Sequence, residues 1–345
     1  MVVDDSVVIR RLVTHALSED PDIDVVGSAS DGTMALARMQ QLRPHVVTLD
    51  IEMPRMNGLE TLRELRKLYP DVIVIMFSTL TERGAAVTME ALALGAQDYV
   101  AKASNMGSLD RSLESLRHEL IPKVKQFFRL PSSPLPPTTA DPQPPMRTRP
   151  PGVFAKQIKK LVVIGVSTGG PTALASVIPG LPRDFRLPVL IVQHMPPMFT
   201  RLLAERLQAQ STIKVAEAAE GMPIVPGAAL IAPGNFHMRI RRDGSQLTVA
   251  LDQSPPENSC RPAVDVLFRS AAETFGGGVI AVVLTGMGRD GFSGCECLKG
   301  QGAYVIAQDE ASSVVWGMPG FVSKAGLADA TVDLNAVVPE IISQL

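Results

Sequence analysis

The chain has 345 residues, of which 46% are hydrophobic and 20% are charged, as is typical of globular proteins. This length exceeds what one hydrophobic core usually supports, so we expect two domains. The formal net charge of −2 argues against a nucleic-acid-binding protein with a strongly basic surface.

Membrane and disulfide patterns point to a cytoplasmic protein. No apolar run is long enough for a membrane helix, and the first residues do not resemble a secretory signal. The cysteines are few, and their number, three, is odd, which argues against a disulfide scaffold. We therefore expect a cytoplasmic chain without membrane insertion.

The first part of the chain alternates strand-like and helix-like segments. The runs at 46–49 and 72–77 are continuously hydrophobic, which is typical of strands buried on both faces of a parallel sheet. Between them, leucines recur every third residue in a helical stripe that stops at Pro70, and 97–101 is typical of another short strand. These segments predict a doubly wound, flavodoxin-like α/β domain with its ligand at the carboxyl ends of the strands.

Charged and hydroxyl side chains follow these predicted strands: Asp4 and Asp5, then Asp50, then Ser78, then Lys102. Three carboxylates at one sheet edge repel one another unless a cation joins them, and all-oxygen ligation suits Mg²⁺. A nearby lysine and hydroxyl can neutralise charge on a phosphoryl group that moves to a carboxylate. A single acid here would be interpreted as a solvated terminus or a helix cap, but the ordered set favours a phosphoryl-transfer site.

The same residues resemble the receiver domain of two-component response regulators, over residues 1 to about 120. The motifs that carry the resemblance are DDS at 4–6, LDIEMP at 49–54, NG at 57–58, ST at 78–79 and YVAK at 99–102. The resemblance implies that Asp50 is the phospho-acceptor, Ser78 the switch hydroxyl and Lys102 the phosphate-binding lysine. The implied Mg²⁺ site combines Asp50 with three further groups: Asp4, Asp5 and the backbone carbonyl of Glu52.

A proline-rich segment separates the two halves of the chain. Residues 131–151 contain nine prolines and no apolar period, which predicts an extended linker. A PxxP ligand for another domain is the less favoured alternative. We expect a receiver at 1–120, a linker at 121–155 and a second domain at 156–345.

The second domain begins with a buried-strand run at 161–164 that leads into Gly165-Val166-Ser167-Thr168-Gly169. The spacing Gly-x-Ser-x-Gly is that of a nucleophile elbow, where a serine hydroxyl is exposed on a tight turn. A glycine-rich phosphate loop is the alternative, but neither of its usual signatures is complete here. Ser167 is therefore a candidate nucleophile that requires a base and an orienting acid.

Two more predicted strands supply those groups. The run at 187–193 ends at His194, and the run at 279–284 leads to Asp290. Alone, His194 could be a hydrogen-bonded strand-end residue and Asp290 a turn former, but with Ser167 they form a potential nucleophile–base–acid set. We expect His237 to be a solvated hairpin residue, because it lies opposite the apolar positions of an alternating strand.

The second domain resembles the CheB family of chemotaxis protein-glutamate methylesterases, which also deamidate receptor glutamines. The resemblance rests on GVSTGGP at 165–171, QHMP at 193–196, APG at 232–234, LTGMGRDG at 284–291 and QDEASS at 308–313. It implies that Ser167 is the nucleophile, His194 the base and Asp290 its orienter, with Thr168 and Met287 at the oxyanion site. The implied substrates are methyl-accepting chemoreceptors, and the implied phosphodonor is a chemotaxis histidine kinase; ester hydrolysis would need no cofactor.

Two other outputs are possible for a receiver fused to such a domain. A DNA-binding output is disfavoured by the near-neutral charge and by the absence of a helix-turn-helix pattern. A non-catalytic phosphate- or nucleotide-binding domain would use the Ser167 loop without hydrolysis. For the esterase, we expect the unphosphorylated receiver to cover the Ser167 cleft and phosphorylation of Asp50 to open it.

Overall fold

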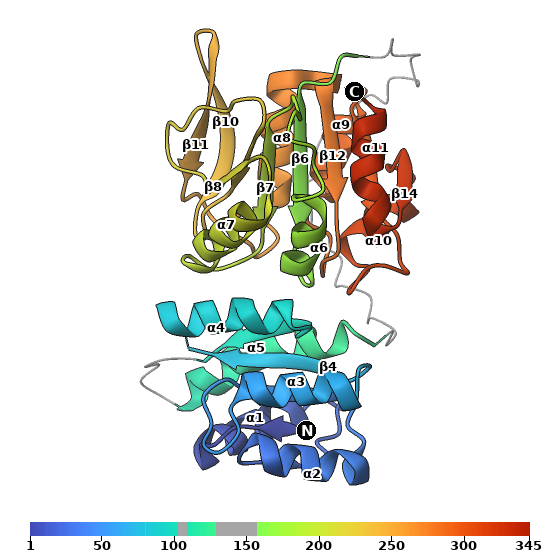
Figure 1. Ribbon diagram of the computed structural model, residues 1–345. Coiled ribbons are helices and arrows are strands. Elements are labelled where there is room, and N and C mark those ends of the chain that lie inside the picture. Colours follow the sequence, from blue (N-terminus) through green and yellow to red (C-terminus); the bar gives the residue numbers. More distant parts are fainter. Residues whose placement is uncertain (80, 103–108, 129–156) are drawn as a thin grey trace.

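The computed structural model describes residues 1–79, 81–102, 109–128 and 157–345, so the predicted proline-rich linker at 131–151 lies outside the described residues. Two α/β units lie one above the other (Figure 1), the first ending at residue 128 and the second beginning at residue 157. Each unit is built on a parallel sheet with helices on both faces, which confirms the predicted fold class.

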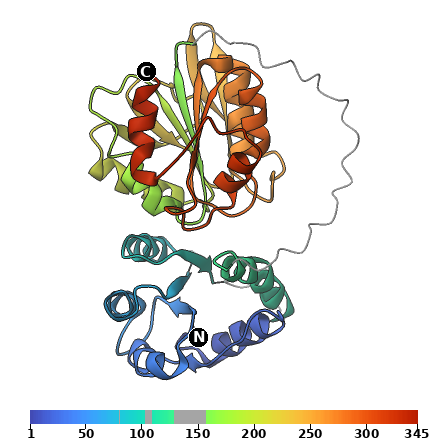
Figure 2. The same cartoon turned by 90° about the vertical axis from the view of Figure 1, so that its right-hand side faces the viewer.

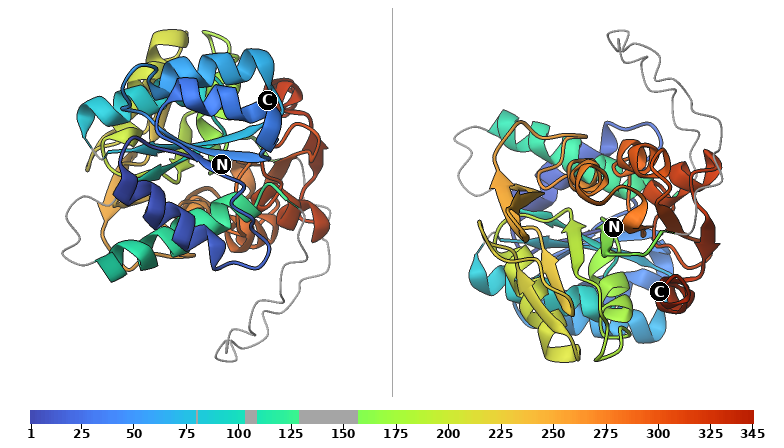
Figure 3. Two further views of the ribbon diagram at one scale, coloured as in Figure 1. Left: turned by 90° about the horizontal axis from the view of Figure 1, so that it is seen from below. Right: turned by 90° about the horizontal axis from the view of Figure 1, so that it is seen from above.

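The first unit has a five-stranded parallel sheet in the order β2-β1-β3-β4-β5, the flavodoxin-like order. Its strands are β1 (Val2–Val3), β2 (Ser28–Ala29), β3 (Val46–Asp50), β4 (Ile73–Ser78) and β5 (Asp98–Ala101). Its helices are α1 (Val7–Ser18), α2 (Gly32–Leu42), α3 (Gly58–Leu68), α4 (Glu82–Ala93) and α5 (Leu109–Lys125). Seen from below, α1 and α5 lie on one face of the sheet, and α2, α3 and α4 lie on the other (Figure 3).

Helix α3 coincides with the predicted leucine stripe. It begins with a capping box in which Asn57 and Glu60 each bond the other's backbone amide. Leu62 and Leu65 are fully buried, whereas Leu68 is 61% exposed. A three-residue spacing drifts around a helix of 3.6 residues per turn, so the end of the stripe leaves the core.

Helix α5 extends beyond the predicted domain boundary at residue 120. Leu116, Leu120 and Val124 are buried on one side of the helix, against the sheet face that it shares with α1. This apolar spacing holds the chain helical to Lys125, so helix α5 includes the first five residues of the predicted linker.

The second unit has a seven-stranded parallel sheet in the order β14-β13-β12-β6-β7-β9-β8. Its strands are β6 (Leu161–Val166), β7 (Val189–Gln193), β8 (Lys214–Glu217), β9 (Ala228–Ile231), β12 (Val279–Val283), β13 (Tyr304–Gln308) and β14 (Ala330–Val332). A separate hairpin pairs β10 (His237–Asp243) with β11 (Gln246–Asp252). The first strand of the unit, β6, is central, with β7 on one side and β12 on the other, so the order of the strands reverses here.

Helices enclose this sheet from both sides (Figure 2). One face carries α6 (Gly170–Val177), α7 (Phe199–Gln210) and α11 (Val337–Ser343). The other carries α8 (Val264–Phe275), α9 (Phe292–Lys299) and α10 (Met318–Lys324). In the described parts of the chain, no helix has both the length and the apolar character that a membrane crossing requires.

Candidate active site

The carboxyl ends of three neighbouring strands bring the predicted residues of the second unit together. Ser167 directly follows β6, His194 directly follows β7, and Asp290 lies in the loop after β12. Because β12, β6 and β7 are adjacent in the sheet, residues more than 100 positions apart in the chain meet at one edge. This placement agrees with the strand-end positions predicted from the sequence.

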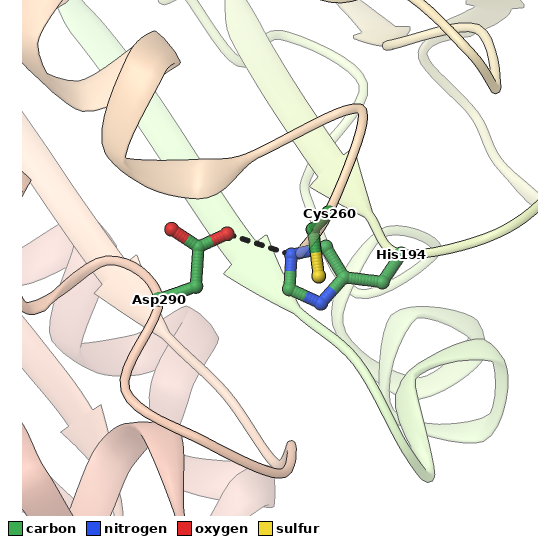
Figure 4. Close-up of side chains that lie close together, drawn as sticks. All are labelled: His194, Cys260 and Asp290. Atoms are coloured by element: carbon green, nitrogen blue, oxygen red, sulfur yellow. Dashed lines mark hydrogen bonds and ion pairs between the residues drawn. The ribbon is translucent and has the colours of Figure 1, made fainter. Parts of the chain in front are cut away.

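His194 and Asp290 form a direct hydrogen bond (Figure 4). The distance from His194 Nε2 to Asp290 Oδ2 is 2.8 Å, and both side chains are largely buried. The bond occupies one ring nitrogen and leaves Nδ1 as the nitrogen that can accept a proton from a nucleophile. Asp290 therefore has the geometry of the acid that orients a general base.

Four further donors hold Asp290 in place. Its Oδ1 accepts hydrogen bonds from the Asn258 side chain at 2.9 Å and from the Asp265 and Gly291 amides at 3.0 Å, and Oδ2 accepts one from the Val264 amide at 2.7 Å. The Val264 and Asp265 amides belong to the N-terminal turn of α8, where helix geometry favours negative charge. Burial alone would raise the pKa of Asp290, but His194 and these amides hold it below its ordinary value. The carboxylate is therefore a fixed anion.

Asn258 and Asp265 were not identified from the sequence. Asn258 Nδ2 bridges the carboxylates of Asp265 and Asp290, and Asp265 Oδ1 accepts the Gly294 amide. Burial raises the pKa of Asp265 to about 6, and the charge of Asp290 adds to this shift. Both residues lie near the start of α8, which no strand-end argument places beside β12.

Cys260 is a third residue at the site that sequence analysis did not single out. Its side chain lies beside the His194 ring (Figure 4) and lines the same cavity. Burial alone would lower the pKa of His194, but the neighbouring Cys260 and the Asp290 hydrogen bond raise it.

The backbone around Ser167 is held on three sides. Its amide donates to the Thr285 carbonyl at 3.0 Å, and its carbonyl accepts from Gln193 Nε2 at 3.0 Å. A Cβ at Gly286 would stand 2.7 Å from Ser167 Cβ, so only glycine fits there without displacing the serine. These contacts fix the serine at the end of β6, with its side chain at the cleft.

Ser167 and His194 line one cavity of about 490 Å³ without a direct hydrogen bond between their side chains in the described structure. Such bonds are often long before substrate binds and tighten only in the reacting complex. The cavity also contains Thr168 and Met287, the two predicted oxyanion residues. Within the described residues, neither of their backbone amides has a hydrogen-bond acceptor, so both can donate to an oxygen in the cleft.

A second cluster lies at the carboxyl edge of the first sheet. Carboxylate oxygens of Asp4, Asp5 and Asp50 lie within 4.8 Å of one another. Lys102 Nζ is 2.7 Å from Asp50 Oδ2 and 3.0 Å from Asp4 Oδ2. Burial raises the pKa of Asp50 to about 6; Lys102 partly offsets this shift, and Asp4 adds to it.

The donor set of this cluster fits a divalent cation. The buried Oδ2 atoms of Asp4 and Asp50 receive no well-oriented hydrogen bond, and the Lys102 ammonium is the cation that approaches them. Glu52 lines the same pocket as Asp5, Asp50 and Lys102. Hard oxygen ligands with two buried, under-satisfied acceptors are what Mg²⁺ requires.

Ser78 is buried and bonds to α4. Its Oγ accepts a hydrogen bond from Thr88 Oγ1 at 2.6 Å and donates to the Gly84 carbonyl at 3.2 Å. The neighbouring Thr79 lines the acidic pocket, whereas Ser78 does not. The predicted switch hydroxyl therefore has a partner on α4 in this arrangement.

One sequence-based expectation is wrong. His237 is completely buried, with Nε2 at 3.2 Å from the Pro255 carbonyl and Nδ1 accepting the Ala263 amide at 3.2 Å. The alternation along β10 correctly marked the inward positions, but the loop between β11 and α8 covers the other face at His237. Its two bonds are to backbone groups, so it supports that loop.

Comparison with known proteins assigns both units. The model of the CheB methylesterase family matches residues 162–341, and the model of the response regulator receiver domain matches residues 1–114. The chain belongs to the CheB methylesterase family.

Relatives along the whole chain agree with this assignment. The protein-glutamate methylesterase/protein-glutamine glutaminase of Trichodesmium erythraeum is 48% identical over 345 residues, covering 100% of this chain and 98% of that protein. The protein of the same name from a Nocardioides species is 50% identical over 347 residues, covering 100% and 94%. The crystal structure of the Thermotoga maritima CheB methylesterase catalytic domain matches with a TM-score of 0.53 and 43% identity, covering 54% of this chain and 99% of that one. The predicted family is confirmed, and neither a DNA-binding nor a non-catalytic output is favoured.

The receiver unit contacts the methylesterase unit beside the Ser167 cleft. Asp98, at the start of β5, accepts a hydrogen bond from Thr168 Oγ1 at 2.9 Å and an ion pair from Lys123 at 3.2 Å. The rings of Tyr99 and Phe199 stack at 4.8 Å with an interplanar angle of 4°. Helix α4 faces α6 and α7 across the same interface (Figure 1).

This interface places receiver residues in the wall of the candidate active site. Asp98, Tyr99 and Lys123 line the same cavity as Ser167 and His194. The sequence motifs identified neither Asp98 nor Lys123, because the pairing of two domains has no signature in either one alone.

Proposed function

We propose that this chain hydrolyses methyl esters of glutamyl side chains on methyl-accepting chemoreceptors, releasing methanol, and deamidates receptor glutamines by the same chemistry. The observation that best supports this proposal is the meeting of Ser167, His194 and Asp290 at three adjacent strand ends, with the 2.8 Å bond between the last two. Membership of the CheB methylesterase family supports the substrate class.

In the proposed reaction, Ser167 is the nucleophile. His194 Nδ1 accepts the hydroxyl proton while Oγ attacks the ester carbonyl, and Asp290 holds the ring by Nε2 and stabilises the imidazolium. The amides of Thr168 and Met287 donate to the tetrahedral oxyanion. The bond to the methoxy oxygen breaks, and His194 returns the proton to release methanol.

Hydrolysis of the acyl-enzyme completes the cycle. His194 takes a proton from a water molecule, the resulting hydroxide attacks the acyl carbonyl, and Ser167 leaves with the proton from the imidazolium. The products are a free glutamate on the receptor and the regenerated serine. With glutamine, the leaving group is ammonia and the other steps are the same.

We further propose that Asp50 accepts a phosphoryl group from a chemotaxis histidine kinase, in the cytoplasm. Asp4, Asp5, Asp50 and the backbone carbonyl of Glu52 would hold Mg²⁺, which would offset charge on the transferred group. Lys102 lies 2.7 Å from Asp50 and would pair with the phosphoryl oxygens. Ser78 would exchange its bond to Thr88 for one to the phosphoryl group, and the loss of that bond would allow α4 to shift.

The contact between the units provides a route from Asp50 to Ser167. Thr168 lies next to the proposed nucleophile, and its hydroxyl donates a hydrogen bond to Asp98 of the receiver unit. A shift of α4 and β5 that breaks this bond would free Thr168 and widen the cleft for a receptor segment. Phosphorylation would then activate the esterase by moving the receiver unit away from the Ser167 cleft.

The test is methanol release from methylated receptor fragments, measured for the wild type and Ser167→Ala with and without a small-molecule phosphodonor and Mg²⁺. We expect release to fall by roughly six orders of magnitude in Ser167→Ala, because a triad without its nucleophile retains little activity. Asp50→Asn should keep the donor-free rate and lose the stimulation. A normal rate in Ser167→Ala would exclude the proposed nucleophile, and equal stimulation of Asp50→Asn would exclude the proposed phospho-acceptor.

A further inference from the structure

Three metal-ligating side chains of different kinds converge in the methylesterase cleft. A ring nitrogen of His194, Sγ of Cys260 and a carboxylate oxygen of Asp290 all lie within 4.8 Å of one another. They come from three separate segments, the end of β7, the loop before α8 and the loop after β12 (Figure 4). The reaction proposed above uses His194 and Asp290 and assigns no role to Cys260.

We propose that His194, Cys260 and Asp290 form a binding site for Zn²⁺, and that the bound ion reversibly blocks the esterase. Sulfur, imidazole nitrogen and carboxylate oxygen are the three donor types that Zn²⁺ takes in proteins. With three protein ligands, the fourth tetrahedral position would be open to water from the cavity of about 490 Å³ beside them. The inhibitory part of this proposal rests on the function proposed above; the binding part does not.

The distances are compatible with a tetrahedral ion after a small movement. Bond lengths of about 2.0–2.3 Å place neighbouring ligand atoms roughly 3.3–3.8 Å apart around Zn²⁺. Atoms that are 4.8 Å apart would therefore need to approach by about 1.5 Å at most, and His194 Nε2 and Asp290 Oδ2, now 2.8 Å apart, would separate by about 0.5 Å. Cys260 is only half-buried, so a rotation of its side chain can supply most of that movement.

The surroundings of the three ligands are already fixed. Asp290 is held by Asn258 and by the first amides of α8. The loop that carries Cys260 is fastened to α8 through Arg269, whose two terminal nitrogens contact both carboxylate oxygens of Glu257 at 2.7 and 2.5 Å. Partners of this kind orient metal ligands and strengthen binding.

The two clusters of potential metal ligands among the described residues would select different cations. The receiver cluster of Asp4, Asp5 and Asp50 is made of oxygen alone, which suits Mg²⁺. The methylesterase cluster contains a thiol and an imidazole, which Mg²⁺ does not favour and Zn²⁺ does. An excess of Mg²⁺ should therefore leave the Cys260 site free for Zn²⁺.

Binding at this site is incompatible with the proposed reaction. If the ion takes Nε2, His194 loses its bond to Asp290; if it takes Nδ1, the lone pair for the Ser167 proton is occupied. Asp290 is withdrawn from its orienting role in either case. Because the thiol and the imidazole must give up their protons to the solvent, binding should tighten as pH rises.

A direct binding experiment tests the site without using activity. The full-length chain, kept reduced with a phosphine, is titrated with Co²⁺ as a spectroscopic substitute for Zn²⁺, and Zn²⁺ affinity is measured by competition with a chromophoric chelator. We expect one ion per chain at the cleft, with a thiolate-to-cobalt charge-transfer band that Cys260→Ser abolishes. Cys297→Ser is the matched control, because Cys297 is also partly exposed and lies outside the cluster; it should retain the band.

Inhibition is measured on methanol release in excess Mg²⁺, with each variant compared to its own rate without Zn²⁺. We expect half-maximal inhibition of Cys260→Ser to need at least about 100-fold more Zn²⁺ than inhibition of the wild type. Loss of a residue that only orients a metal ligand already costs about 10–100-fold in affinity, and Cys260 would be a ligand itself. A Zn²⁺-selective chelator should restore the wild-type rate. Equal inhibition of wild type and Cys260→Ser, or a cobalt band that survives Cys260→Ser, would overturn the proposal; a cobalt band in a chain without esterase activity would refute only the proposed function.

Discussion

Asp50 and Asp290 are both buried aspartates at the carboxyl edge of a parallel sheet, but their pKa values move in opposite directions. Burial raises the pKa of Asp50 to about 6. Asp290 is equally inaccessible, and its pKa nevertheless lies below the ordinary value. The difference arises from what surrounds each carboxylate.

Asp290 has enough donors to compensate for the water that it loses. It receives the His194 ring, an asparagine amide and three backbone amides, two of them from the start of α8. Asp50 has the Lys102 ammonium as its main partner, and it shares that ammonium with Asp4, whose negative charge repels its own. Burial therefore costs Asp50 more than it costs Asp290.

The two environments suit two different tasks. An anion that orients a base should keep its charge and position throughout the reaction, as Asp290 does. A carboxylate that accepts a phosphoryl group and helps to hold a cation needs under-satisfied oxygens beside a pocket, as Asp50 has. An aspartate at a strand end can thus have a lowered or a raised pKa. The pKa is lowered where a helix N-terminus lies beside the carboxylate and raised where a second acid does.

Among the changes that test this comparison of Asp50 with Asp290, the largest expected effect comes from removing the charge of Asp290. Asp290→Asn should lower kcat for methanol release by about 10⁴-fold, because His194 loses the acceptor that sets its tautomer and stabilises its positive charge. Single-turnover release from methylated receptor fragments would measure the loss.

Asp265→Asn is the matched control for that substitution. Asp265 is buried beside Asp290 and shares Asn258 with it, but it has no bond to His194. Its substitution should cost less than about tenfold in kcat, within the range of a hydrogen-bond rearrangement. Similar losses of kcat in both variants would show that any substitution in this region impairs the enzyme. That result would contradict a specific role of Asp290 in orienting His194.

The next effect concerns the stability of the receiver. An acid whose folded pKa is raised binds more protons when folded than when unfolded, so it lowers stability as pH rises from about 3.8 to about 6. Without Mg²⁺, Asp50→Asn should therefore stabilise the full-length chain by about 2–3 kcal/mol near pH 7.5. The gain should shrink toward pH 4.

Urea unfolding with a chelator present, at about pH 5 and about pH 7.5, would measure this change. Asp5→Asn serves as the comparison, because Asp5 belongs to the same cluster but is exposed; we expect a change within about 0.5 kcal/mol. A stabilisation by Asp50→Asn that does not depend on pH would contradict the electrostatic explanation.

The smallest expected effect is at the contact between the two units. Asp98→Ala removes the acceptor of the Thr168 hydroxyl and the partner of Lys123, and hydrogen bonds to charged groups contribute about 1.5–3 kcal/mol. We expect the donor-free rate of methanol release to rise roughly fivefold or more, with a correspondingly smaller stimulation by the phosphodonor.

Arg201→Ala is the control at the rim of that interface. Arg201 pairs with Glu82 across the two units, but both side chains are exposed, and such pairs contribute about 0–1 kcal/mol. Its donor-free rate should change less than that of Asp98→Ala. An unchanged rate in Asp98→Ala would show that the Thr168 contact does not restrain the enzyme.

Much of the fold could be predicted because hydrophobic runs mark buried parallel strands directly. The hydrophobic run at 161–164 lies in β6. The polar residues that follow this run and the other predicted strands lie at the carboxyl edges of the sheets, where parallel strands place ligands. Ser167, His194 and Asp290 were accessible to this reasoning because each follows its own strand. Asn258, Cys260 and Asp265 were not, because they come from a loop and a helix start.

Two positions show where local sequence patterns are insufficient. His237 was expected in solvent because its strand alternates, but a loop from further along the chain covers it. Helix α5 continues past the predicted boundary at residue 120, because Val124 is buried where α5 lies against the sheet. In both, burial depends on a partner that is distant in the sequence.

The sequence by itself determined the two α/β domains, the family, and the strand-end residues of both candidate sites, because each follows from local patterns and spacing. Only the tertiary structure decided which charges are compensated, since two of the donors to Asp290 come from α8, and Asp4, which competes with Asp50 for Lys102, directly follows β1. Only the tertiary structure also placed Cys260 beside His194 and Asp98 against Thr168. Contacts of this kind depend on how separate segments pack, and no single segment encodes them.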